Sequence, residues 1–390
     1  MSTDVRFFHS GMAGAPSLSN AAGSLIAVLD GCLINGFNAL AVTSIAVLGG
    51  VALVTFAASH GFGTAAQYVT ISGATPAGLN GSKKVLTTPN SNQLTFDATG
   101  IADQSATGTI SAKRPPIAGW SKAFSSGNKA AYRSVHASAL GMFLQIDDSA
   151  VGQYQPARGY ESMTDVDTGT NPFPLTATAS VWEKNNSASA RAWALVGDGR
   201  RFYLFVASTG AGGLPWFPVY FGDINPYRTG GDAYACALFA TVGGQYYIHN
   251  INNAQASPAW AFARASNGVL GAIGTNGLYG HNAYVGAGYF GQGLAYPDPL
   301  TGGAAAFRPV HVRETLAASN NAVRGEMPGL IQALHAIGSN LNNLSLVPMF
   351  DNSAYPSGLL WVYTTAGTGF TTSGGTNVGG GMLFDLDNPW

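Results

Sequence analysis

Three acidic residues in one short segment have the types and part of the spacing of a calcium-binding loop. They are Glu161, Asp165 and Asp167, and they are followed by Gly169. A calcium loop needs alternating oxygen ligands and a later acidic residue that closes the loop. Asn171-Pro172 follows instead, and the next glutamate is Glu183. We therefore expect hydrogen-bonded turn carboxylates in this segment and no bound metal.

The histidines and cysteines also lack the spacing of a metal site. No two of the seven histidines are arranged as His-x-His or His-x3-His, so zinc is not expected. Cys32 and Cys236 are too few for a disulfide-stapled module. Cys32 also falls on the apolar stripe of a predicted helix, which favours a position in the core.

Two other patterns could serve catalysis, and neither has the context it needs. Gly286, Gly288 and Gly291 match G-x-G-x-x-G, but the residues that follow cannot start the helix that a dinucleotide site requires. Asp147-Asp148 could be an acid/base pair, but adjacent residues in a strand point to opposite faces. No G-x-S-x-G elbow, Walker loop or Cys-x-x-Cys occurs. We therefore expect no cofactor and no enzymatic activity.

The composition points to a folded chain with little charge for its surface. Only 9% of the 390 residues are charged, against about 25% in an average protein, and glycine accounts for 52. The net charge is −1, which excludes the basic excess of a nucleic-acid binder. The hydrophobic share of 46% excludes a disordered chain. Because a chain near zero net charge tends to associate, we expect much of the surface to be covered by other subunits.

The segment from Gly31 to Ser82 contains no charged residue, and it raises the question of a membrane span. Within it, Ala39 to Ala58 is long enough to cross a bilayer. However, no Lys or Arg lies close to either end. Gly49-Gly50 also separates two β-rich runs, and glycine supplies the positive φ of a tight turn. We therefore predict a β-hairpin and no membrane span.

Residues 1–114 are predicted to form an N-terminal domain that is led by a helix. Apolar residues at helical spacing predict the helix over residues 19–37. The hairpin and several short strands separated by turn residues predict a small β-module over 43–112. Lys113-Arg114-Pro115-Pro116 looks like a linker, because consecutive prolines favour extended backbone.

Residues 115–390 are predicted to form a larger β-rich domain. Short alternating strands with Gly, Pro and Asn between them favour a sandwich or a related architecture. Leu330, Ile331, Leu334 and Ile337 form a stripe that predicts one short helix near 328–338. The expected fold is therefore mainly β: a small helix-led β-domain followed by a larger β-sandwich-like domain with few helices.

One segment of the second domain has the composition of a contact surface. Gly277 to Pro297 is rich in glycine and tyrosine and has no charged residue. Glycine lets the backbone approach a partner closely, and aromatic rings offer a large contact area at low entropy cost. The candidate contact residues are Tyr279, Tyr284, Tyr289, Phe290 and Tyr296.

Several segments spread over most of the chain also carry a resemblance to known proteins. They are Val5–Phe7 with Gly14–Pro16, Leu29–Phe37, Ser59–Phe62 with Val69–Thr75 and Leu79–Gly81, Lys129–Ser134, Arg158–Glu161 with Asp165–Thr170, Arg324–Leu330, and Phe384–Trp390. Together they resemble virion structural proteins encoded in the tail modules of tailed bacteriophages and prophages, including Mu-like siphophages. The piece that begins at Ser59 is similar to a small β-module that recurs in phage tail proteins. The last segment resembles an Asp-Leu-Thr-Gly-Pro-Trp close, with Asn388 in place of the glycine.

The resemblance implies a place in the virion, at the tail tip or baseplate, and no catalytic residue. We therefore predict a structural component of a phage particle that is assembled in the host cytoplasm. Its expected partners are copies of itself, with a trimer as first choice, and other tail or baseplate proteins. A receptor-binding tail subunit that recognises a host glycan is one alternative, and a capsid or decoration protein is another.

Overall fold

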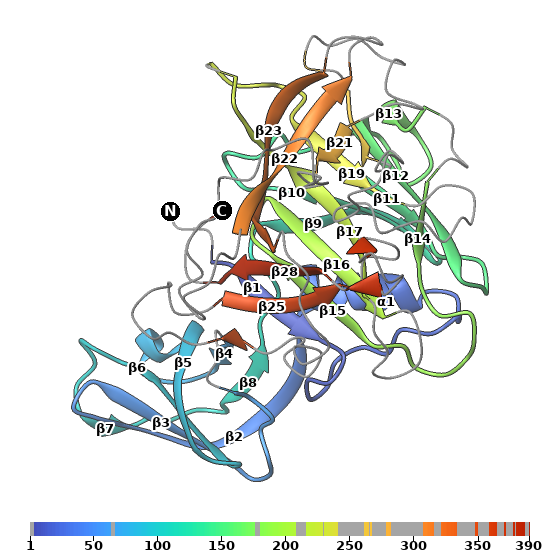
Figure 1. Ribbon diagram of the computed structural model, residues 1–390. Coiled ribbons are helices and arrows are strands. Elements are labelled where there is room, and N and C mark those ends of the chain that lie inside the picture. Colours follow the sequence, from blue (N-terminus) through green and yellow to red (C-terminus); the bar gives the residue numbers. More distant parts are fainter. Residues whose placement is uncertain are drawn as a thin grey trace.

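The protein is mainly β in the computed structural model, with one short α-helix among the described residues (Figure 1). The predicted fold class is therefore confirmed. The structure describes residues 4–63, 67–175, 180–207, 216–228, 230–240, 261–264, 266, 278–281, 307–315, 321–333, 348–349, 359–364, 370–371, 377–378, 380–386 and 390.

The strands between Phe37 and Arg114 form a closed sheet, here called the closed module, which lies at the lower left of Figure 1 beside the rest of the chain. Six strands follow one another in the order β3-β6-β5-β4-β8-β2, and pairing between β2 and β3 closes the ring. A short 3-10 helix, η2, precedes β5, and β7 pairs with the end of β2. The elements are β2 (Phe37–Leu48), β3 (Val51–Phe56), β4 (Tyr68–Ser72), η2 (Ala77–Leu79), β5 (Gly81–Asn90), β6 (Gln93–Asp97), β7 (Gln104–Ser105) and β8 (Ser111–Arg114).

The hairpin between β2 and β3 confirms the prediction made from Gly49-Gly50. Leu48 pairs with Val51, and Gly49 and Gly50 have φ of 57° and 77°. Alternate residues point into the module, so that Ala52 and Val54 are fully buried. The segment Ala39 to Ala58 therefore lies in two strands of a closed sheet. No helix formed by the described residues is long and apolar enough to cross a membrane.

The remaining described residues, here called the body, contain a large antiparallel sheet. Its order is β1-β15-β16-β17-β19-β20-β21-β22-β23-β28-β25-β24, and β18 pairs with β23. The strands are β1 (Arg6–His9), β15 (Trp193–Gly197), β16 (Arg201–Ala207), β17 (Trp216–Asp223), β18 (Asn225–Pro226), β19 (Cys236–Phe239), β20 (Ala261–Phe262), β21 (Leu278–His281), β22 (Phe307–Thr315), β23 (Asn321–Ala333), β24 (Pro348–Met349), β25 (Leu359–Thr364) and β28 (Gly380–Asp385). A separate pair comprises β26 (Phe370–Thr371) and β27 (Asn377–Val378).

A second sheet in the body packs against the large one. Its order is β13-β12-β11-β10-β9, and β14 pairs with β12. Trp120 of the second sheet meets Phe202 of the large sheet edge to face, with ring centroids 5.2 Å apart. The shared core is therefore built from two facing sheets. The strands are β9 (Trp120–Ser126), β10 (Lys129–Ser134), β11 (Phe143–Asp147), β12 (Tyr154–Met163), β13 (Gly169–Phe173) and β14 (Val181–Glu183).

The predicted N-terminal helix exists, but it is shorter than 19–37 and belongs to the body. It comprises α1 (Ser24–Asp30) and a π-helical turn, η1 (Gly31–Asn35). Leu25 and Leu29 pack in the core of the body, and β1 pairs with β15. The closed module has a core of its own. The domain predicted over 1–114 therefore needs correction, because the helix does not pack on the β-module that follows it in sequence.

The short helix predicted near 328–338 is also wrong for the part that the structure describes. Residues 328–333 continue β23, and residues 334–338 lie outside the described residues. The backbone of Ile331 pairs with Pro309 on one side and Leu383 on the other. Two neighbouring strands thus supply backbone partners that a helix would not need, and this pairing overrides the local apolar stripe.

Candidate functional site

Several of the few charged side chains are buried in the body as ion pairs. In four pairs, neither side chain is more than 5% exposed. Nε and Nη2 of Arg324 donate hydrogen bonds to the carboxylate of Asp232, at 2.7 and 3.2 Å. The pairs are Lys184–Asp148, Arg191–Glu183, Arg201–Asp198 and Arg324–Asp232. Eight charged residues therefore lie in the interior, which leaves even fewer charged side chains on the surface.

The tip of the β2–β3 hairpin shows the opposite feature, because apolar side chains are exposed there. Leu48 is 75% exposed and Val51 is 41% exposed, and the two residues face each other across the turn. Ala46, two residues before Leu48, also faces outward. This tip is an apolar end of the closed module, at its outer side in Figure 1, although the exposed carboxylate of Asp103 accepts the backbone N–H of Gly49 at 2.8 Å.

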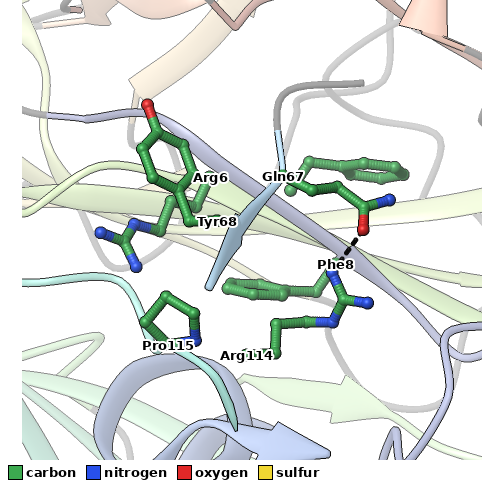
Figure 2. Close-up of a pocket in the computed structure, with 7 residues that line it drawn as sticks. Arg6, Phe8, Gln67, Tyr68, Arg114 and Pro115 are labelled. Atoms are coloured by element: carbon green, nitrogen blue, oxygen red, sulfur yellow. Dashed lines mark hydrogen bonds between the residues drawn. The ribbon is translucent and has the colours of Figure 1, made fainter. Parts of the chain in front are cut away.

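A small hollow lies where β1 of the body meets the closed module (Figure 2). It is partly open to solvent, and its enclosed space is about the size of one water molecule. It is lined by Arg6, Phe7, Phe8, Gln67, Tyr68, Arg114 and Pro115. Two of these residues are buried arginines, one from β1 and one from the end of β8.

Arg114 is held by neutral groups. Its Nη1 donates to Oε1 of Gln67 at 2.7 Å, and its Nη2 donates to the carbonyl of Gly61 at 3.2 Å. The guanidinium also lies 4.7 Å from the ring centroid of Phe62. Burial lowers the pKa of Arg114 to about 10, so the side chain keeps its charge at neutral pH.

Arg6 ties the body to the closed module. Its Nη1 donates to the carbonyl of Pro116 at 2.9 Å, and its Nη2 donates to Oγ of Ser82 at 3.0 Å. The guanidinium lies 4.7 Å from the ring centroid of Tyr68. Desolvation lowers the pKa of Arg6 as well, and the half-exposed carboxylate of Asp4, 3.9 Å away, acts in the other direction.

The acidic segment that resembled a calcium loop forms turn interactions, as predicted. The carboxylate of Asp165 accepts the backbone N–H of Asp167 at 2.8 Å, and this bond lowers the pKa of Asp165. Asp167 pairs with Lys129 at 2.7 Å, and Glu161 pairs with Arg264 at 2.8 Å. The three carboxylates thus serve different partners. The described residues include no group of three or more side chains that could hold a metal ion.

Asp147 and Asp148 lie in different environments, as strand geometry predicts. Asp148 is fully buried, whereas the side chain of Asp147 is 33% exposed and lies 3.7 Å from Lys129. The carboxylate of Asp148 accepts the N–H groups of Leu25 and Ile26, at 2.7 and 3.3 Å. Asp148 therefore caps the start of α1, where Gly23 offers no side chain.

The candidate contact surface from the sequence stays a prediction. The backbone of Tyr279 lies in β21, opposite Arg313 of β22. Tyr284, Tyr289, Phe290 and Tyr296 lie outside the described residues.

Comparisons with known proteins assign no family to the chain. No protein-family model matches the sequence, and no curated protein matches it.

Sequence reasoning missed the arginine-lined hollow. Arg114 was interpreted as part of a linker, and Arg6 only as part of a resemblance. The available signal was rarity: no Lys or Arg occurs between Arg6 and Lys83. However, the absence of a carboxylate beside Arg114 becomes visible only when the closed module is folded against β1.

Proposed function

We propose that the chain is a structural subunit of a tailed-phage virion, located at the tail tip or baseplate, and that it assembles with copies of itself. The resemblance of its segments to tail-module proteins supports the virion, and its mainly β fold agrees with such a subunit. The role is structural rather than catalytic. The chain would be made in the host cytoplasm and incorporated into the particle there.

One observation carries the assembly part of this proposal. Charged side chains are buried as pairs in the body, while apolar side chains are exposed at the tip of the closed module. Isolated exposed apolar residues are ordinary, but Leu48 and Val51 lie together on the two sides of one hairpin turn. Solvation alone would favour exposed charged side chains and buried apolar side chains.

A second copy of the same chain is the occupant that fits the hairpin tip. When a surface meets its own copy, any excess of one charge is placed against the same charge. The side chains of Leu48 and Val51 carry no charge, so these two side chains can contact their counterparts around a symmetry axis without such a penalty. Three- and six-fold axes are common at the ends of phage tails, which makes a trimer the first expectation.

Light scattering on the purified protein tests the proposal. A homo-oligomer should have a mass that is a multiple of 40.1 kDa, with a trimer as the expected state. A protein that stays monomeric at high concentration would contradict self-assembly. The receptor-binding alternative rests on the segment from Gly277 to Pro297 and remains a prediction from the sequence.

A further inference from the structure

The closed module is inserted into the body through a narrow neck. Phe37 at the start of β2 and Arg114 at the end of β8 pair with each other, so the two ends of the module lie side by side. Gly36 has a φ of 69°, and a Cβ at this position would lie 2.1 Å from the carbonyl oxygen of Arg114. Beyond the neck, the N–H of Ile117 donates to the carbonyl of Cys32 at 2.8 Å, which returns the chain to the body.

The two parts have separate apolar cores. The buried core of the module runs from Ile45 to Ala112 in sequence. The core of the body includes Phe37, which packs on Phe8, and its next member in sequence is Ile117. The ring of six strands also closes without a strand of the body. Because burial of apolar surface is the main driving force for folding, each part contains what it needs to fold as a unit.

Polar side chains lie at the junction between the two cores. Arg6 of the body and Arg114 of the module are buried there, and Gln67 lies beside Arg114 (Figure 2). The hydrogen bonds of Arg114 go to Gln67 and Gly61, which both belong to the module. These bonds stay intact when the module moves away, and the freed polar groups of the junction can bond to water instead. Separation of the two parts therefore exposes less apolar surface than unfolding of either part.

Arg6 bridges the two parts across the junction. Its Nη2 donates to Oγ of Ser82 in β5 of the module at 3.0 Å, and its guanidinium lies 4.7 Å from the ring centroid of Tyr68 in β4. Its Nη1 donates to the carbonyl of Pro116 at 2.9 Å, beside the neck. A planar guanidinium with fixed donors sets the direction of such contacts more strictly than a flexible ammonium group. Arg6 therefore holds the module in one orientation to the body.

We propose that the closed module is an independently folding insertion that can pivot on its neck, and that Arg6 is the clasp that fixes its orientation on the body. The direction of the hairpin tip depends on this orientation, because Leu48 and Val51 lie at the outer end of the module. A released module presents the tip in other directions without unfolding of either part. The inference does not depend on the virion proposal.

Calorimetry of the whole chain tests the independent unit. Val54 and Leu29 are fully buried, the first in the core of the module and the second in the core of the body. We expect two unfolding transitions. Val54→Ala should lower the temperature of one transition by about 5–10 °C, and Leu29→Ala should lower the other by about 5 °C, because each change leaves a cavity in one core only.

The same two variants decide the case in which the transitions overlap in the wild type. Each variant should shift one part of the heat absorption and leave the rest at its wild-type temperature. A single transition that both substitutions lower would overturn the independent unit, because it would show that the two cores unfold together.

Small-angle X-ray scattering of Arg6→Met tests the clasp. This variant should keep both calorimetric transitions and raise the radius of gyration by about 1 Å or more, since the module is no longer held in one orientation. Arg158→Met is the matched control, because Arg158 also donates to a backbone carbonyl, that of Pro174 at 2.9 Å, and lies over the ring of Tyr160, but within the body. It should leave the radius of gyration unchanged. An unchanged radius of gyration in Arg6→Met, or the loss of either transition, would contradict the clasp.

Discussion

Lys184 and Asp148 form an ion pair in which both side chains are fully buried. The remaining hydrogens of the ammonium are satisfied by the carbonyls of Ala21 and Ala150, at 2.7 and 3.2 Å. Asp148 in turn accepts from the first turn of α1. The pair therefore joins the N-terminal helix to the second sheet of the body.

Lys184→Met should lower the free energy of unfolding by about 3–5 kcal/mol, because it leaves the buried carboxylate of Asp148 without its counter-charge. Lys129→Met is the matched control, since Lys129 pairs with Asp167 at a surface where the two side chains are 31% and 55% exposed. Its loss should cost no more than about 1 kcal/mol. Urea unfolding measures both, and equal effects would contradict the account.

The hairpin turn gives a second prediction, which concerns backbone strain alone. Gly49 has a φ of 57°, and no other atom lies within 4 Å of the place where its Cβ would be. Gly49→Val should lower stability by about 1–3 kcal/mol, because a β-branched residue disfavours positive φ. Gly49→Asn should cost much less, because asparagine tolerates this region. Thermal unfolding of the two variants measures the difference; equal melting temperatures would argue against this turn.

The hairpin could be predicted because its signal is local, whereas the other parts of the fold depend on distant residues. One continuous segment contains the Gly49-Gly50 turn and the β-rich runs on both sides that form the two strands. The residues near Leu330 form a strand because β22 and β28 flank them, and the helical stripe carries no information about those neighbours. Asp148 likewise replaces a local helix cap from far along the chain.

The candidate site also has features that neighbouring residues determine and features that distant residues determine. The acidic turn around Asp165 could be predicted from neighbouring residues. The hollow could not, because it depends on Arg6 of β1 and Arg114 of β8 meeting across the junction of the body and the closed module.

His9 gives a prediction about pH. Burial, and to a lesser degree the charge of Arg114, lower the pKa of His9 from 6.5 to about 4. Between these two pKa values the unfolded chain binds a proton at His9 that the folded chain does not bind. The contribution of His9 to the free energy of unfolding is therefore complete above pH 6.5 and is lost as the pH falls toward 4. His9→Gln should therefore flatten the fall in stability over that window by about 1.4 kcal/mol per pH unit at most.

Urea unfolding of the wild type and His9→Gln between pH 4.5 and 7 measures this difference. Parallel profiles for the two proteins would show that His9 does not couple to folding.

The exposed hairpin tip gives a prediction about association. Leu48→Asp should weaken self-association about ten-fold or more, because it places a charge in an apolar contact between copies. Val135→Asp introduces the same charge at a residue of the body that is 57% exposed, and it should leave association unchanged. Sedimentation velocity over a concentration series compares the two. Equal behaviour of both variants would remove the hairpin from the contact.

Quantitative mass spectrometry of purified phage particles tests the central claim most directly. Particles produced from the genome that encodes this chain are separated from the lysate, and its copy number is measured against the other virion proteins. We predict a fixed number of copies per particle, in a multiple of three. A chain that is abundant in the lysate and absent from infectious particles would contradict a structural role in the virion.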